Sequence, residues 1–218
     1  LNLNTMVLTV HRAVLDTVPA LHTAGTRIWF SEKYRKSDYI TYAANETVNG
    51  KALTVAPLGT LDEATAATDT ITVNRRFDRP YPPGNFQING VAFPASLDTN
   101  NLTITWSHRD RTQQTVSFTQ QSTGNIGPET GVTYTVTTTN VTTNTVINTT
   151  SGISVTTFSE SIPSGIYTLR IDIKSVRGGV DSWQSQSCTL AYAQAQLIID
   201  TEDGRDITAE SGEILVTE

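Results

Sequence analysis

Apolar and polar residues alternate with a period of two in two well-separated stretches of the chain. In residues 102–107, Leu102, Ile104 and Trp106 are separated by Thr and Ser, and residues 167–173 repeat the pattern with Tyr, Leu and Ile. Such alternation is typical of strands with one buried and one solvent-exposed face. Because Trp106 is the largest apolar group on its face, we expect a hydrophobic core to form over it.

The same pattern, interrupted by turn residues, predicts a β-sandwich over residues 85–197. The polar stretch 139–150 is almost all Thr and Asn. It favours a long sheet edge over a low-complexity, phase-separating tract, since Thr is a strong strand former. The segment following 114–120 is too long for a tight turn, which indicates an elaborated connection between the second and third strands. The expected strands are 86–93, 102–107, 132–138, 153–158, 167–176 and 182–192.

Residues 1–79 show no sustained helical periodicity and predict a small, mostly β domain. Asn49-Gly50 is a favourable dipeptide for a tight turn, so we expect a turn there, between two strands. Residues 60–63 have the spacing of a capping box, which predicts a single helical turn. The expected strands are 1–10, 26–30, 39–43, 51–56 and 69–73.

Two further segments complete the predicted organisation. Residues 80–84 are rich in Pro, which stiffens the chain, and predict a short rigid linker. Residues 198–218 are acidic and repeat with a spacing of eight, since Glu202, Glu210 and Glu218 occupy equivalent positions. Each copy predicts one short strand and one turn. Such a ribbon cannot bury its apolar side alone and needs the sandwich, another protein or further copies of itself.

Composition and charge narrow the functional classes. The 218 residues are 37% hydrophobic and 17% charged, with a formal net charge of −6. An acidic chain without a basic stripe argues against nucleic-acid binding. No apolar run approaches the length of a membrane span. Cys188 is the single cysteine, which excludes an internal disulfide and is most simply interpreted as a small buried residue.

Motifs for catalysis or metal binding are not found in the sequence. His11, His22 and His108 lack metal-ligand spacing, and neither a nucleophile elbow nor a phosphate loop occurs. The acidic stretch 200–206 invites a calcium interpretation, but it departs from the EF-hand pattern, and a solvated acidic turn is the simpler alternative. We therefore expect no enzyme activity, no catalytic residue, no cofactor and no metal. Four glycosylation sequons, at Asn45, Asn101, Asn140 and Asn148, are attributed to chance in a chain rich in Asn and Thr.

The densest polar cluster is His108-Arg109-Asp110-Arg111, directly after the strand that carries Trp106. One interpretation is a contact for a partner or a sugar at the end of the sandwich. The other, which we favour, is a surface ion-pair cluster in which Asp110 offsets Arg109 or Arg111. No partner-binding residue is assigned.

Two residues give the sandwich a family resemblance. Trp106 on an early strand and Tyr167, after a turn that opens a late strand, resemble the Trp and the tyrosine corner of fibronectin type III domains. The fold expected from the whole chain is therefore all-β: a small β domain (1–79), the linker, a fibronectin type III-like sandwich (85–197) and a short β-ribbon tail (198–218).

Two longer stretches resemble the large hub or tip proteins of long-tailed bacteriophage tails, in the group of the tip attachment proteins. These are residues 11–30 (HRAVLDTVPALHTAGTRIWF) and 79–111, and the acidic repeat of the tail is also similar. The resemblance implies the C-terminal part of a structural virion protein at the distal end of the tail, in the tail tip or baseplate. It also implies a homotrimer, assembled in the host cytoplasm, with other tail proteins as partners and with host attachment as a further role.

The sequence also leaves an alternative open, namely a carbohydrate-binding or spacer module of a secreted bacterial enzyme. That alternative predicts a monomer with an exposed aromatic platform. The start of the sequence lacks both an initiator Met and a signal-peptide pattern, so we expect the numbering to begin inside a longer chain.

Overall fold

The computed structural model describes residues 11–27, 39–114 and 119–194, and the backbone of 198–200 and 206–208. The chain is all-β, as predicted, and its only helical segments in the described part are two short 3-10 turns. No helix among these residues is long and apolar enough to cross a membrane. The chain divides into two compact units, residues 21–79 and residues 1–20 together with 80–218.

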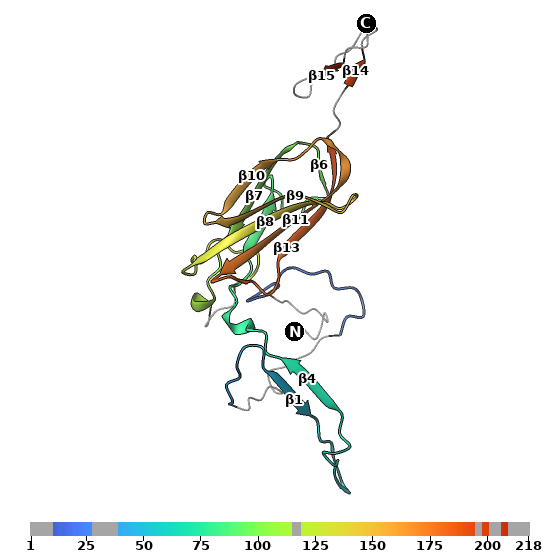
Figure 1. The fold of residues 1–218 in the computed structure, drawn as a ribbon, viewed down its shortest axis with the longest axis vertical. Coiled ribbons are helices and arrows are strands. Elements are labelled where there is room, and N and C mark those ends of the chain that lie inside the picture. Colours follow the sequence, from blue (N-terminus) through green and yellow to red (C-terminus); the bar gives the residue numbers. More distant parts are fainter. Residues whose placement is uncertain (1–10, 28–38, 115–118, 195–197, 201–205, 209–218) are drawn as a thin grey trace, which may run out of the picture. The chain divides into compact units, whose positions relative to one another are not determined.

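The larger unit is a β-sandwich of two sheets, drawn from green to red in Figure 1. The first sheet has the order β10-β7-β5 and the second the order β6-β13-β11-β8-β9, with β12 added to β11. Neighbouring strands are antiparallel except for the short β6–β13 pair. This order is that of a fibronectin type III-like domain. The strands are β5 (Gly84–Ile88), β6 (Ser96–Leu97), β7 (Asn101–Ser107), β8 (Val132–Asn140), β9 (Thr145–Ile153), β10 (Thr157–Ser161), β11 (Gly165–Arg177), β12 (Val180–Asp181) and β13 (Gln186–Gln194).

The core lies between the two sheets and follows the alternation of the sequence. Trp106 is buried on β7, and its ring meets that of Tyr134 on β8 edge-on, with centroids 5.2 Å apart. Every second residue of β11 is buried from Leu169 to Ile173. The expectation that a core forms over Trp106 is therefore confirmed.

Tyr167 forms the predicted tyrosine corner. Its hydroxyl donates to the carbonyl oxygen of Pro163 at 2.8 Å, and its ring lies 4.8 Å from that of Tyr192. Burial, with a smaller contribution from Tyr192, raises the pKa of Tyr167 to about 12. The phenol therefore stays protonated and keeps donating at neutral pH, which pins the turn that precedes β11.

The Thr/Asn stretch forms the end of β8, a turn and β9, which is the last strand of its sheet. The predicted sheet edge is therefore confirmed. Hydroxyl groups pair across the two strands, with Thr137 Oγ1 3.3 Å from Thr149 Oγ1 and Thr135 Oγ1 donating to Ser151 Oγ at 3.2 Å. The strand predicted at 153–158 lies further along the chain, because β9 continues through Ile153 and β10 begins at Thr157.

The Pro-rich segment differs from the expected linker. Pro80, Pro82 and Pro83 are all buried, and the Pro83 carbonyl accepts a hydrogen bond from Gln186 Nε2 at 2.8 Å. The segment therefore packs as part of the sandwich and leads directly into β5. Its Pro content indicated stiffness but could not indicate burial, which depends on β13.

The first residues also group differently from the prediction of a single domain over 1–79. Arg12 and Val18 both contact the sandwich: the Arg12 carbonyl accepts from the Gln121 amide at 3.3 Å, and the Val18 amide donates to Gln184 Oε1 at 2.8 Å. Both partners lie more than 100 residues further along the chain, so no local pattern could reveal them.

The smaller unit is built on a hairpin, β1 (Thr47–Lys51) with β4 (Thr68–Thr72), which runs to a narrow tip in Figure 1. The tip holds a second pair, β2 (Val55–Ala56) with β3 (Gly59–Thr60), joined by a two-residue turn at Pro57-Leu58. We call residues 47–72 the arm. A 3-10 turn, η1 (Arg76–Asp78), follows the arm.

Local predictions for this unit were partly wrong. Asn49-Gly50 lies inside β1 and forms no turn, and residues 39–43 form no strand. The helical turn predicted at residues 60–63 is not formed, because Thr60 belongs to β3. A hydrogen-bonded turn follows instead, in which the Asp62 carbonyl accepts from the Ala66 amide at 3.1 Å and Asp62 Oδ1 accepts from the Ala64 amide at 2.8 Å. The predicted strands at 1–10 and 26–30 lie wholly or mostly outside the described residues.

The tail repeat forms a small antiparallel pair, β14 (Ile198–Asp200) with β15 (Asp206–Thr208). Ile199 and Ile207, which occupy equivalent positions in the first two copies of the repeat, are partners across the pair. One short strand for each of the first two copies is therefore confirmed. The third copy lies outside the described residues.

Candidate functional site

Arg109 anchors the long connection between β7 and β8. Its side chain is buried, and its guanidinium donates to five backbone carbonyls, four in the turn that folds over it and one in the preceding residue. Nη1 donates to His108 O and Gly124 O, both at 2.9 Å. Nη2 donates to Gln120 O at 3.4 Å, Gln121 O at 2.9 Å and Thr123 O at 2.8 Å. Burial lowers the pKa of Arg109, but a guanidinium stays charged at neutral pH. The charge therefore holds the connection against the end of β7.

Gly84 makes room for this anchor. A Cβ atom at Gly84 would overlap the guanidinium of Arg109, so any side chain here would displace the guanidinium from its position. The next residue, Asn85, donates its amide to the Gln121 carbonyl at 2.7 Å. The start of β5, the end of β7 and the connection are thus one packed unit.

Asp110 caps the 3-10 turn η2 (Arg111–Gln113) rather than pairing with an arginine. Its carboxylate accepts from the Thr112 amide at 2.8 Å, from Thr112 Oγ1 at 2.6 Å and from Gln113 Nε2 at 2.7 Å. Burial acts to raise the pKa of Asp110, but these hydrogen bonds outweigh it, so the pKa lies below its usual range.

Glu129 is the buried acid that compensates two arginines. Its Oε1 accepts from Arg111 Nε at 2.8 Å and from Arg177 Nη1 at 3.0 Å. Arg177 ends β11, so this pairing ties the connection to the second sheet. Removing one partner of a buried pair leaves an uncompensated charge, which makes Glu129 a structural residue.

Neither interpretation of the His108–Arg111 cluster is therefore confirmed. Arg109 and Asp110 are each only 5% exposed, so they cannot present a contact surface for a sugar or a partner. The surface ion pair is also wrong, because Asp110 accepts from Thr112 and Gln113 and because Arg111 pairs with Glu129. The connection between β7 and β8 folds back over Arg109, and the residues around the cluster do not predict this.

His108 extends the aromatic core toward the same end. Its Nδ1 lies 2.7 Å from the hydroxyl of Tyr134, and the two rings stack with centroids 5.7 Å apart. Burial lowers the pKa of His108 and raises that of Tyr134, so both groups are neutral at pH 7. The neutral imidazole of His108 stacks on the buried ring of Tyr134 and covers this end of the core.

The other residues that could bind a metal or act in catalysis are the histidines and Cys188. His11 and His22 are exposed, whereas His108 is half-buried, and the described residues contain no group of three metal-ligating side chains. Cys188 is buried, its Sγ donates to the Pro94 carbonyl at 3.6 Å, and burial raises its pKa. It is the small buried residue expected from the sequence. The side chains of the acidic stretch 200–206 lie outside the described residues.

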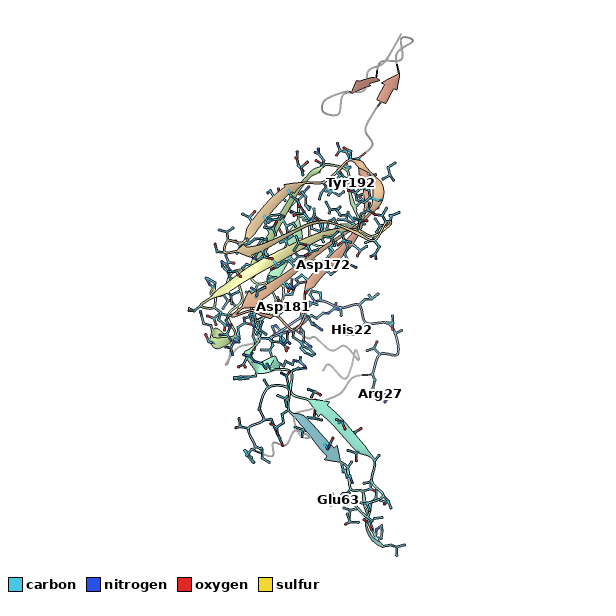
Figure 2. All side chains as sticks on the ribbon, in the orientation of Figure 1. His22, Arg27, Glu63, Asp172, Asp181 and Tyr192 are labelled. Carbon is cyan, nitrogen blue, oxygen red and sulfur yellow. The ribbon has the colours of Figure 1, made fainter. Side chains whose placement is uncertain are left out.

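Exposed apolar side chains gather on the tip of the arm. Leu58, at the apex of the turn, is 103% exposed, Val55 is 79% exposed, and Leu53 and Leu61 are both 41% exposed. We call these four residues the apolar tip. Residues 52–61 around them contain no charged residue. Figure 2 shows the side chains of this end of the hairpin, with Glu63 labelled beside it.

The described part of the unit that carries the tip buries almost no apolar side chain. Among the described residues of 21–79, Ala66 is the only buried hydrophobic residue. A two-stranded sheet is marginal in water without a packed face. Covering the exposed parts of the apolar tip, equivalent to roughly two and a half side chains, would contribute about 4–8 kcal/mol before the costs of association.

The sequence analysis missed this surface, although a signal was present. The stretch 52–61 joins four large apolar residues to Pro57 and Gly59 without a charge, which is unusual for a solvent-exposed hairpin. Gly59 has a φ of +134°, a conformation that favours glycine and that follows directly on the apex. The turn was predicted at Asn49-Gly50 instead of at Pro57-Leu58.

Comparisons with known proteins bear only on the fold. No protein-family model matches the chain, and no curated protein matches it. Among solved structures, the extracellular domains d3–d4 of rat CD45 match with a TM-score of 0.36 and 8% identity, over 84% of this chain and 83% of that one. The FN1–FN3 domains of chicken CNTN1 match with a TM-score of 0.33 and 13% identity, over 67% of this chain and 44% of that one. At these values the likeness carries no argument about function, and the fold assignment rests on the strand order.

Proposed function

We propose that this chain is a structural component of a bacteriophage tail tip or baseplate, forming the C-terminal part of a hub protein. In this role it scaffolds and docks neighbouring tail proteins and contacts the host surface. The observation that carries the proposal is the arm, which has regular strand pairing and an exposed apolar tip but almost no buried core. A chain element of this kind is completed by neighbours in an assembly.

The sandwich supplies the complementary property, which is rigidity. Arg109 and Glu129 lock a long connection onto both sheets, and Tyr167 pins the turn before β11. A stiff module with a docking arm suits a non-enzymatic part that holds neighbours in place. Phage tails are named because of the resemblance of residues 11–30 and 79–111. From the same resemblance we propose a homotrimer at the distal end of the virion tail, assembled in the host cytoplasm.

Immuno-electron microscopy tests this function directly. Antibodies raised against residues 85–197 are applied to phage particles from the source culture. Label concentrated at the distal end of the tail supports the proposal, and the labelled copies per particle then test the trimer. Unlabelled particles together with abundant soluble antigen in the culture supernatant would refute it.

One observation favours the alternative of a carbohydrate-binding or spacer module. Tyr39 and Phe77 are largely exposed aromatic residues, and Trp183 is 39% exposed. Aromatic faces of this kind stack on sugars. A glycan array probed with the full chain decides between the two functions. Specific glycan binding that is lost on Phe77→Ala would favour the module, whereas no binding to any glycan would disfavour it.

A further inference from the structure

The chain contains two Asn-Gly dipeptides, Asn49-Gly50 within β1 and Asn89-Gly90 directly after β5. Asparagine loses its side-chain amide most readily when glycine follows, because glycine has no side chain to shield its backbone nitrogen. Both asparagines are exposed, so water reaches them. The structure around each dipeptide therefore decides which of the two reacts in the folded chain.

Asn89 is held by three hydrogen bonds to the neighbouring strand of the sandwich. Its amide donates to the Thr103 carbonyl at 2.8 Å, its Oδ1 accepts from the Thr103 amide at 2.7 Å, and its Nδ2 donates to the Asn101 carbonyl at 3.1 Å. Thr103 lies on β7 between Leu102 and Ile104, which are fully buried. The Asn89 side chain can therefore rotate toward the Gly90 nitrogen only after contacts to the sandwich open.

Asn49 is held less firmly. Its Oδ1 accepts from Thr70 Oγ1 at 2.8 Å, in an exposed contact between two side chains. Every residue of β1 and β4 is exposed except the half-buried Val48, and in the part of the chain that the structure describes these strands pair only with each other. A two-stranded sheet of this kind opens often in water. The extended backbone of β1 keeps Asn49 Cγ away from the Gly50 nitrogen, and each opening lets the two atoms meet.

We propose that Asn49 is the site at which the folded chain deamidates, and that the reaction breaks the register of the arm. The Gly50 nitrogen forms a bond to Asn49 Cγ, and the side-chain amide leaves as ammonia with the proton that the Gly50 nitrogen gives up. Water then opens the cyclic imide and leaves aspartate or isoaspartate at position 49. The reaction needs no partner and does not depend on the proposed function.

The two products affect the arm differently. Isoaspartate runs the main chain through Cβ and so adds one methylene to β1, which shifts Gly50 and Lys51 against their partners Asp69 and Thr68. Aspartate leaves the main chain unchanged and adds one negative charge, so it is the milder change. Because the described part of the unit buries only Ala66 among its hydrophobic residues, the hairpin has little packing to offset a lost register.

Peptide mapping by tandem mass spectrometry tests the proposal. The purified full chain is incubated at mildly alkaline pH, both folded and in urea, and the rate in urea serves as the reference for each position. The ratio of folded to unfolded rate should be at least about tenfold higher for Asn49 than for Asn89, since more hydrogen bonds must open before Asn89 reacts. Equal ratios, or a higher ratio for Asn89, overturn the proposal. A folded chain that keeps its Asn49 amide after the urea sample has converted also overturns it.

Two variants test the role of the local contacts. Thr70→Val removes the hydrogen bond on the Asn49 side chain and keeps the branched shape, so conversion at position 49 should rise about two- to tenfold. Gly50→Ala should slow the conversion, because its methyl group shields the nitrogen. The added Cβ would meet only the Asp69 carbonyl oxygen, at 3.9 Å, so β1 can accommodate it. Unchanged rates in both variants would contradict the assignment to Asn49.

Hydrogen exchange tests the effect on the arm. Wild type and Gly50→Ala are aged together, and the amides of residues 47–51 and 68–72 are compared. They should lose protection in the aged wild type and keep it in the aged variant, while the amides of β7 keep their protection in both. Equal protection of the arm in the two aged chains would refute the loss of register. These outcomes are independent of where antibodies label the phage particle, so the two proposals can fail separately.

Discussion

The two units of this chain bury their apolar residues to opposite extents. In the sandwich, alternate residues of β7, β8, β11 and β13 close over Trp106 and Tyr134. In the unit 21–79, strand pairing is equally regular, but Ala66 is the only buried hydrophobic among its described residues. Backbone hydrogen bonding alone is thus enough to define a hairpin but not to give it a core. The sandwich buries its own apolar residues, whereas the described part of the unit 21–79 leaves its large apolar side chains mostly exposed.

The largest expected effect is on the sandwich core. Trp106→Ala removes the residue that both sheets cover, and it should lower the free energy of unfolding by about 3–5 kcal/mol. Chemical denaturation followed by tyrosine and tryptophan fluorescence measures the change. A loss below about 1 kcal/mol would mean that Trp106 does not organise the core.

The buried arginine gives the next largest effect. Arg109→Met keeps most of the length of the side chain but leaves five carbonyls without this donor, at an expected cost of about 2–4 kcal/mol. The matched control is Arg170→Met on β11, where the half-exposed Arg170 pairs with Asp172 and should contribute about 0–1 kcal/mol. Equal losses for the two variants would contradict the anchoring role of Arg109.

The tyrosine corner contributes a single hydrogen bond. Tyr167→Phe removes the hydroxyl that donates to Pro163 and keeps the ring beside Tyr192. We expect it to cost about 1 kcal/mol, with unfolding of the purified chain in urea as the measurement. No measurable loss would show that ring packing alone holds the turn before β11.

A small effect of pH should come from Asp110. Because its folded-state pKa is depressed, it adds stability above its unfolded pKa of about 4, and this stability is lost as pH falls through the lower folded value. The difference in unfolding free energy between wild type and Asp110→Asn should therefore be constant at neutral pH and change only below about pH 4. A change centred near pH 7 would point to another group.

The smallest expected effect is at the tip of the arm. Leu58→Ser should leave the unfolding free energy of the monomeric chain within about 0.5 kcal/mol, because Leu58 is fully exposed. Chemical denaturation of the purified chain at low concentration measures the change. A large loss would show that Leu58 packs within its own chain, and it would remove the contrast between the two units.

The sequence by itself determined two kinds of feature. One is the position and buried face of strands with clear alternation, and the other is the role of single residues that depends on their type and their immediate neighbours. Alternation located β7 and β11 and the faces they bury, and Trp106, Tyr167 and the buried Cys188 were assigned from residue type and position. The eight-residue repeat of the tail predicted one short strand in each copy, and β14 and β15 are those strands in the first two copies. These features depend on the two-residue period of a strand, which is written in consecutive residues.

Only the tertiary structure decided how distant segments meet. Arg109 is buried because the turn 120–124 folds over it, and Glu129 pairs with Arg177 from the end of β11. The Pro-rich segment is buried against Gln186, and residues 11–20 join the sandwich. Each contact links residues that are far apart in sequence, and its stability comes from desolvation and charge pairing in the folded chain. Such interactions produce no repeating pattern in neighbouring residues. The sequence of the cluster 108–111 therefore shows that charged side chains are present, but it does not show which distant groups will cover or pair with them.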